Sequence, residues 1–346
     1  MTSSFPPALA DLDSNYSPAI IDRFARLVDR LPLPAWAFYL ALLIVGYLFF
    51  TVIRWLTGYQ PMGTFSSMAA PAVMWDVSIL ALHQYLDRYA CRALDGFNKV
   101  LGASDTELEQ LYTRLTVLPA RWEAVGAIFW AVLASFLAWM QMDGFREYFS
   151  RWEIALTVFG FAIGGSFLAH VVYQLRLVSR IHASAAEIDL FDPEPLYSFS
   201  GLTVRTAIGI VLVQYLALLV LPVEIRFSAI LIPAASVFAL AIVVFAWPLW
   251  GMHRRLVEHK QRIEGDINML LKQSVSELIR NAHSGVVEDP EQVGKTLSAL
   301  RAGQAVVAEL PTWPWQPRIV RGLATALLLP IFLWLLQELL ARAAGF

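Results

Sequence analysis

The amino-acid sequence predicts an all-α, polytopic membrane protein with six, or alternatively seven, transmembrane helices. Of its 346 residues, 58% are hydrophobic and 16% are charged, and its mean hydropathy is +0.56. Soluble domains are far more polar than this. Residues 251–318 depart from that composition, because they are rich in charge and carry a helical repeat of apolar positions. We expect this segment to lie in water, between the last two membrane helices.

Six apolar stretches have about the length that crosses a hydrocarbon core of roughly 30 Å as a helix. They are residues 33–56, 124–141, 154–175, 207–221, 228–250 and 319–340. Tryptophans stand at several of their ends, as Trp36 and Trp55 do around the first stretch. Indole rings prefer the headgroup level of a bilayer, so this placement supports the predicted spans.

Residues 67–86 allow two interpretations. Their centre is apolar, but Asp76 lies in the middle and Pro71 near the start. A carboxylate without compensation at the bilayer centre costs about 3 kcal/mol. We therefore favour a short re-entrant or interfacial helix. The alternative is a seventh span that turns Asp76 toward the interior of the bundle.

The distribution of basic residues predicts the orientation of the chain. With residues 251–318 in the cytoplasm, most of the 26 Lys and Arg residues lie on the inner side, as the positive-inside rule requires. We expect the protein in the inner, or plasma, membrane of the cell. A seventh span would move only the N-terminal side and would make the charge distribution slightly more uneven. Charge thus favours seven spans, whereas Asp76 favours six.

Two regions before the second span are expected to form amphipathic helices. The N-terminal segment, residues 1–32, carries apolar positions of an interfacial helix at Ile20, Phe24, Leu27, Val28 and Leu31. Residues 57–123 are expected to hold the re-entrant segment and further cytoplasmic helices. One of these begins with the capping box Ser104-Asp105-Thr106-Glu107. Residues 124–250 form a four-helix transmembrane region with a cytoplasmic loop at 176–206.

Residues 251–318 are predicted to form an antiparallel helical hairpin before the final transmembrane region, residues 319–346. The first helix ends at Gly285, and Asp289 and Pro290 begin the second. Because both ends of the segment return to one membrane face, the two helices must run in opposite directions. Lys260 and Gly265 interrupt a regular coiled coil. The apolar stripe of the first helix is a candidate docking surface, made of Leu256, Ile263, Ile267, Leu270 and Leu278.

Polar residues within the predicted membrane region are the candidate site residues: Asp76, His170, Gln174 and Gln214. His170 and Gln174 share a helix face at i,i+4 spacing, and we expect Gln214 to reach them across a helix pair. Ionisable groups inside a membrane are functional candidates by default. An interhelical hydrogen bond contributes only about 0.6 to 2 kcal/mol, and we favour this structural role over conduction or ligand binding.

Residues 187–194 place four carboxylates in one loop, those of Glu187, Asp189, Asp192 and Glu194. Clustered oxygens suit a hard cation, but the spacing matches no known loop and the glycine of a sharp turn is absent. We favour a loop stiffened by its prolines. The single cysteine, Cys91, excludes an internal disulfide and a multi-cysteine metal site.

The sequence carries no catalytic signature: HExxH, GxSxG and a phosphate-binding glycine loop are all missing. We expect no enzyme activity, no cofactor and no metal. The leading hypothesis is a docking, assembly or signal-relay protein that acts through its cytoplasmic hairpin. Its expected partners are the lipid bilayer and a second copy or another protein, but no nucleic acid. The alternative is a channel or transporter for a small solute or ion, past the candidate site residues.

Overall fold

The computed structural model describes residues 17–65, 70–140, 150–184, 197–219, 223–284, 290–315 and 319–329, with single positions beyond. This part of the chain is helical apart from turns, loops and one isolated bridge between Pro18 and Pro119, so the predicted all-α class is confirmed. The helices are α2 (Ile20–Arg30), α3 (Ala35–Leu56), α4 (Ala70–Leu101), α5 (Asp105–Thr116), α6 (Ala120–Met140), α8 (Arg151–Ser184), α9 (Ser198–Leu219), α10 (Val223–Ser284) and α11 (Pro290–Glu309).

Four described helices are long and apolar enough to cross a membrane: α3, α6, α8 and, in α9, Ser198–Leu216. They coincide with the first four predicted spans. Many of their apolar side chains are exposed on the surface of the chain, such as Phe49 on α3 and Phe129 on α6. Exposure of so much apolar surface is unfavourable in water, whereas contact with lipid carries no such cost. The predicted span at 228–250 lies within α10, and the described part of the last one is the shorter apolar helix Ile319–Leu329.

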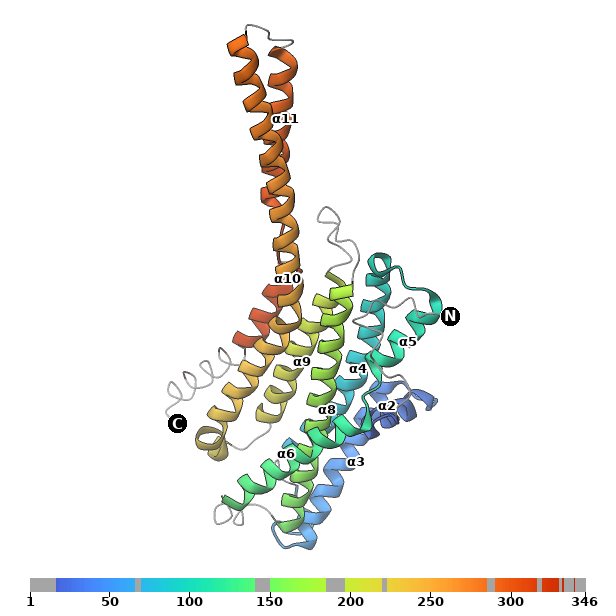
Figure 1. The fold of residues 1–346 in the computed structure, drawn as a ribbon. Helices are drawn as coiled ribbons and strands as arrows, with labels where there is room; N and C mark the ends of the chain where they lie inside the picture. The colour runs from blue at the N-terminus through green and yellow to red at the C-terminus, as the bar shows by residue number, and fades with distance from the viewer. Residues whose placement is uncertain are drawn as a thin grey trace.

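The long helices alternate in direction (Figure 1). Tyr39 of α3 donates a hydrogen bond to the carbonyl oxygen of Leu80, whereas Gly46 of the same helix meets Val73, so α3 and α4 are antiparallel. Gly126 of α6 meets Gly165 of α8, and Trp130 stacks on Phe161, which makes that pair antiparallel as well.

Helices α4, α8 and α10 run in one direction, opposite to that of α3 and α6. Asp76 of α4 lies against Gly160 of α8, and Asp87, further along α4, bonds to His170, so these two helices are parallel. Arg176 of α8 lies over the Trp247 ring of α10, and Arg255 bonds to the His182 carbonyl oxygen, which makes α8 and α10 parallel too. Helices α4, α8 and α10 therefore run toward the same end of the bundle, the end from which α10 continues beside α11 (Figure 1).

Helix α4 is continuous from Ala70 to Leu101 and does not turn back within residues 70–86, the described part of the predicted re-entrant segment. Pro71 falls in the first turn, where its missing N–H leaves no hydrogen bond unmade. The Asp76 carboxylate fits because Gly160 offers no side chain opposite it. The helix ends before Gly102, which has φ +61°, and the predicted capping box of Ser104 and Glu107 then opens α5.

Helix α2 corrects the predicted N-terminal stripe. Val28 is buried as expected, but Ile20 and Leu27 are exposed, and Ile21 and Ala25 are buried in their place. The helix is rotated because its inner face carries the buried Asp22, which bonds to groups of α4 and to the backbone before α6.

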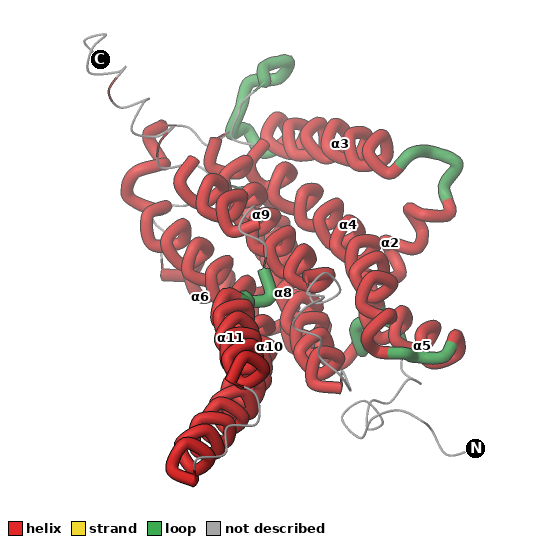
Figure 2. The backbone as a smooth tube through the Cα atoms, turned by 90° about the horizontal axis from the view of Figure 1, so that it is seen from above, coloured by secondary structure: helices red, strands yellow, loops and turns green. Residues whose placement is uncertain are grey.

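Helix α10 runs for 62 residues without interruption, which corresponds to about 93 Å. Beyond His253 it is accompanied by α11, and we call these two segments the α10–α11 pair. Asn268 bonds to Gln304, and Lys260 bonds to the carbonyl oxygens of Ala308 and Leu310, so the two helices run in opposite directions. The pair projects from one edge of the bundle, away from α2 and α5 (Figures 1 and 2).

Stacked rings hold the base of this pair. Trp313 stacks on His253 with 3.8 Å between ring centroids, and on Trp315 with 4.1 Å. Trp315 in turn stacks on Phe245 of α10. The chain that follows α11 is thus fixed against α10 at the point where α10 leaves the bundle.

The largest hydrophobic core lies between α4, α5, α8 and α9 and includes the base of the α10–α11 pair. Its fully buried large side chains include Phe97, Leu111, Ile181 and Phe199, and Met252 and Leu256 of α10 belong to the same core. The projecting pair and the bundle therefore share one continuous packed interior.

Candidate functional site

Four ionisable side chains from three helices meet inside the bundle: Asp22 of α2, His83 and Asp87 of α4, and His170 of α8. We call them the His–Asp cluster. His83 and His170 are each 1% exposed and Asp22 is 2% exposed, while the Asp87 side chain is 14% exposed. Groups of this kind are seldom buried unless they are paired or bind an ion.

Asp22 lies between the two imidazoles. Its Oδ1 atom is 3.1 Å from Nε2 of His83 and 3.6 Å from Nδ1 of His170. Its Oδ2 atom accepts a hydrogen bond of 2.7 Å from the backbone N–H of Leu118. The imidazole rings are close, with centroids 4.3 Å apart and planes at 76°. Nδ1 of His83 and Nδ1 of His170 are buried without a hydrogen-bond partner among the described residues.

Asp87 holds the other side of the cluster. Its Oδ1 atom accepts hydrogen bonds from Nε2 of His170 at 2.9 Å and from Nε2 of Gln174 at 3.2 Å. Its Oδ2 atom is 3.4 Å from Nε2 of His83. The Gln174 amide also donates to the Leu115 carbonyl oxygen, which fixes it in place. The position of each imidazole is thus set from two sides.

Glu123 of α6 brings α2 into this arrangement. Its carboxylate accepts the backbone N–H groups of Ile20 at 2.6 Å and Ile21 at 3.1 Å, and the hydroxyl of Ser166 at 3.1 Å. The first N–H groups of a helix lack partners within it, and the helix dipole favours an anion there. Glu123 therefore caps α2 from another helix and holds Asp22 against α4 and α8.

The structure brings together two of the four predicted site residues. His170 and Gln174 share the carboxylate of Asp87, whereas Asp76 lies two turns before His83 on α4, partly buried against Gly160. Gln214 does not reach them. Because Gly209 of α9 faces Leu82 and the two helices are antiparallel, Gln214 is level with residue 77 of α4.

Sequence reasoning missed Asp22, His83, Asp87 and Glu123. His83 and Asp87 stand at i,i+4 spacing inside the apolar face of α4, and that interruption was a usable signal. Asp22 and Glu123 had no such signal, since each precedes an apolar segment as a helix-start acid commonly does. The four carboxylates predicted in residues 187–194 lie outside the described residues.

The residues of the predicted docking surface differ in burial along α10. Leu256 is 2% exposed and belongs to the core, and Ile263 and Ile267 are half-buried beside α11. Leu270 and Leu278 are 46% and 38% exposed. These two residues, with Met269, Val275 and Ile279, are exposed apolar side chains of the distal part of α10, and we call this group the outward face of the α10–α11 pair.

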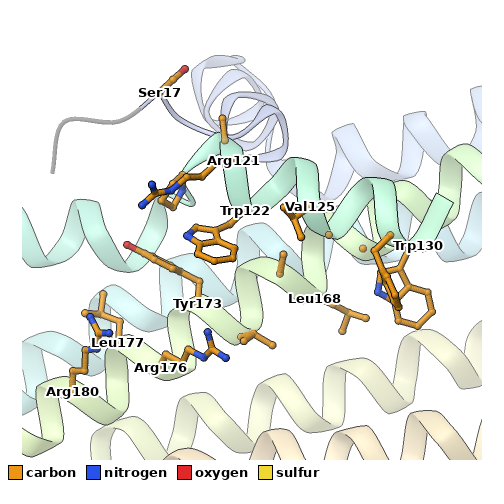
Figure 3. Close-up of a pocket in the computed structure, with 17 residues that line it drawn as sticks. Ser17, Arg121, Trp122, Val125, Trp130, Leu168, Tyr173, Arg176, Leu177 and Arg180 are labelled. Carbon is orange, nitrogen blue, oxygen red and sulfur yellow. The ribbon is translucent and has the colours of Figure 1, made fainter. Parts of the chain in front are cut away.

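A groove of about 800 Å³ lies between the start of α6 and the second half of α8 (Figure 3). Three arginines line it, Arg121, Arg176 and Arg180, together with the aromatic residues Trp122 and Tyr173. Guanidinium groups and amphipathic rings are typical of the level at which a membrane protein meets lipid headgroups.

Comparisons of the chain with protein-family models, curated proteins and solved structures found no match.

Proposed function

We propose that the protein spans a membrane seven times and acts as an assembly and signal-relay protein through the α10–α11 pair. The proposed spans are α3, residues 70–87 of α4, α6, most of α8, α9, the apolar part of α10 and the segment from 319. The alternating directions of α3, α4, α6 and α8 support a crossing by α4, in preference to the six-span interpretation.

Charge supports a cytoplasmic position for the α10–α11 pair. Arg176 lies over the Trp247 ring of α10, about two turns before His253, where the pair begins, and Arg121 and Arg180 line the same groove as Arg176. Basic residues concentrate on the cytoplasmic side of membrane proteins. The N-terminal helix α2 is at this end as well, so we place it on the cytoplasmic side.

The observation that carries the proposal is the continuity of α10. One helix packs on α8 and α9 within the bundle and then extends beyond it for about 45 Å. A tilt of its membrane part would therefore displace the distal tip. The outward face gives that tip an apolar surface, and apolar surfaces of this kind mark contacts with other proteins.

We assign this face to a second copy of the chain. Two antiparallel helices bury only one apolar stripe each, and packing two such pairs gives the four-helix bundle, a stable arrangement. The residues of the outward face lie between Met269 and Ile279 of α10, in the stretch that runs beside α11.

The test compares two triple variants in mild detergent and in membranes. The first variant combines Leu270→Asn, Leu278→Asn and Ile279→Asn. It should leave the monomer folded and abolish cross-linked dimers. The matched control combines Lys272→Asn, Gln273→Asn and Ser276→Asn, at exposed polar positions of the same helix. It should leave the dimers intact. A wild-type chain that is monomeric by light scattering and by cross-linking would reject the assignment, as would dimers that survive the first variant.

A second candidate function, a path for cations, is favoured by one observation. Asp76, His83 and Asp87 follow one face of α4 at i, i+7 and i+11, and all lie toward α8. In the proposed topology this face leads from the bilayer interior to the cytoplasmic edge. Proteoliposomes should then show a proton or cation flux that Asp76→Asn lowers. Flux at the background of empty liposomes would reject this function.

A further inference from the structure

We propose that the His–Asp cluster is a binding site for a divalent transition metal of the Zn²⁺ class. The ligand atoms are Oδ1 of Asp22, Nε2 of His83 and Nδ1 of His170. This inference is independent of the proposed function, because it rests on the geometry of the cluster alone.

The ligand atoms have the separations that such an ion requires. Zinc binds imidazole nitrogen and carboxylate oxygen at about 2.0 to 2.2 Å, so ligand atoms around a tetrahedral ion are about 3.3 to 3.6 Å apart. Oδ1 of Asp22 is 3.1 Å from Nε2 of His83 and 3.6 Å from Nδ1 of His170. One ligand atom from each of the three residues lies within 4.8 Å of the other two.

The far sides of two ligands are already occupied, as in protein metal sites. A metal-bound histidine usually donates its other ring N–H to a carboxylate, which fixes the ring and raises its basicity. Nε2 of His170 donates in this way to Asp87, and Gln174 holds Asp87 in turn. Oδ2 of Asp22 is bound to the Leu118 N–H, which leaves Oδ1 for the ion.

Nδ1 of His170, like Nδ1 of His83, is an atom that hydrogen bonding among the described residues leaves unexplained. It is buried, lacks a hydrogen-bond partner among the described residues and faces the Asp22 carboxylate. A buried nitrogen without a hydrogen-bond partner destabilises the folded state. Coordination of a metal would give this atom a role that the protein groups around it do not.

Charge favours the same assignment. In the part of the chain that the structure describes, the ion pairs of Asp22 and Asp87 within the cluster are with His83 and His170. Two buried carboxylates are balanced by these imidazoles only if both carry an extra proton. A divalent cation balances them with both imidazoles neutral, which is the form that binds metal.

The type of ligand selects the class of ion. Mg²⁺ and Ca²⁺ prefer six or more oxygen ligands, whereas imidazole suits zinc and its neighbours in the first transition series. Asp87, which holds Nε2 of His170, remains outside the ligand set. The site is thus a two-histidine, carboxylate centre that joins α2, α4 and α8.

The first experiment uses the full chain in mild detergent. After removal of metal with a chelator, Zn²⁺ or Co²⁺ should bind at one ion per chain and raise the unfolding temperature, whereas Mg²⁺ should do neither. X-ray absorption of the zinc-loaded chain should show imidazole nitrogen at about 2.0 Å. This wild-type measurement does not depend on the folding of any variant.

Substitutions then locate the site. The double variant His83→Gln with His170→Gln should lose stoichiometric binding, and Asp87→Asn should weaken the affinity by about 10- to 100-fold. His283→Gln, at an exposed histidine of α10, is the control for adventitious surface binding and should change nothing. Substoichiometric binding, zinc without imidazole scattering, or full binding by the double variant would each overturn the proposal.

Discussion

Two buried centres of ionisable side chains lie along α8, one at its start and one near its middle, and they are built differently. At its start, Glu153 pairs with Arg54 of α3 at 2.6 Å. Further along, His170 belongs to the His–Asp cluster, about 26 Å away by the rise of a helix. Each centre ties an N-terminal helix to α8, and in the proposed topology each lies near one edge of the hydrocarbon core.

In the first centre, the described charges include one of each sign. One guanidinium meets one carboxylate, and the second oxygen of Glu153 accepts the backbone N–H of Ser150. The His–Asp cluster holds two carboxylates and two imidazoles, so its charge depends on protons or on an ion from outside. The pair of Arg54 and Glu153 therefore needs no ion from outside for its carboxylate to have a counter-charge. The His–Asp cluster is the centre at which we propose that an ion binds.

The largest effect is expected at the pair of Arg54 and Glu153. Arg54→Met should lower the free energy of unfolding by about 3 to 5 kcal/mol, because it leaves a carboxylate buried without its counter-charge. The double variant with Glu153→Gln should recover most of this loss, since it removes both charges. Unfolding by SDS in mixed micelles measures both. A double variant no more stable than Arg54→Met would show that the pair contributes through something other than charge.

The second prediction separates the two centres. Gly165 of α8 lies against the backbone of Gly126 of α6, so a Cβ on Gly165 would collide with the Gly126 carbonyl oxygen. Gly165→Ala should cost about 1 to 3 kcal/mol, because main-chain atoms must move. It should also disturb the neighbouring contact of Ser166 with Glu123, and hence the His–Asp cluster, but not Arg54 and Glu153.

Gly164→Ala is the matched control for that variant. A Cβ there would meet its nearest neighbour, Ile79, at 3.7 Å, which is ordinary contact. Thermal unfolding with and without Zn²⁺ gives the readout: only Gly165→Ala should reduce the stabilisation by zinc. Equal losses in the two variants would mean that the helix crossing does not position the cluster.

The two centres also show which features of this fold can be predicted from local sequence and which depend on tertiary contacts. Hydropathy and charge follow local composition, so they located α3, α6, α8 and α9, and the capping box of Ser104 was readable from spacing alone. The cluster is assembled from residues far apart in the chain, and its geometry is set by tertiary contacts such as Glu123 with the N-terminus of α2. Asp76 argued against a membrane span at residues 67–86, since its neighbour Gly160 cannot be found from a local sequence pattern.

The third prediction concerns the cap that aligns α2. Glu123→Gln keeps one acceptor for the N–H groups of Ile20 and Ile21 but removes the charge that the helix dipole favours. We expect a loss of about 1 kcal/mol. Protease should also cut near the start of α2 more readily. Glu109→Gln, on the exposed side of α5, is the control. Unchanged cleavage in Glu123→Gln would mean that hydrogen bonding alone docks α2.

The smallest effect is a change of rate, and it tests the side on which the cluster lies. Burial, with Asp87 and Asp95 nearby, raises the pKa of the Cys91 thiol to about 11. The thiolate is the reactive form, so its fraction at pH 7 is small and grows about tenfold for each pH unit below the pKa.

An impermeant maleimide should thus label Cys91 slowly, and faster at pH 8.5 than at pH 7. This labelling should occur in inverted vesicles and not in intact cells. Ser276→Cys in a Cys91→Ala background, at an exposed position of α10, should label rapidly from the same side. Labelling of either thiol from outside intact cells would reverse the proposed orientation.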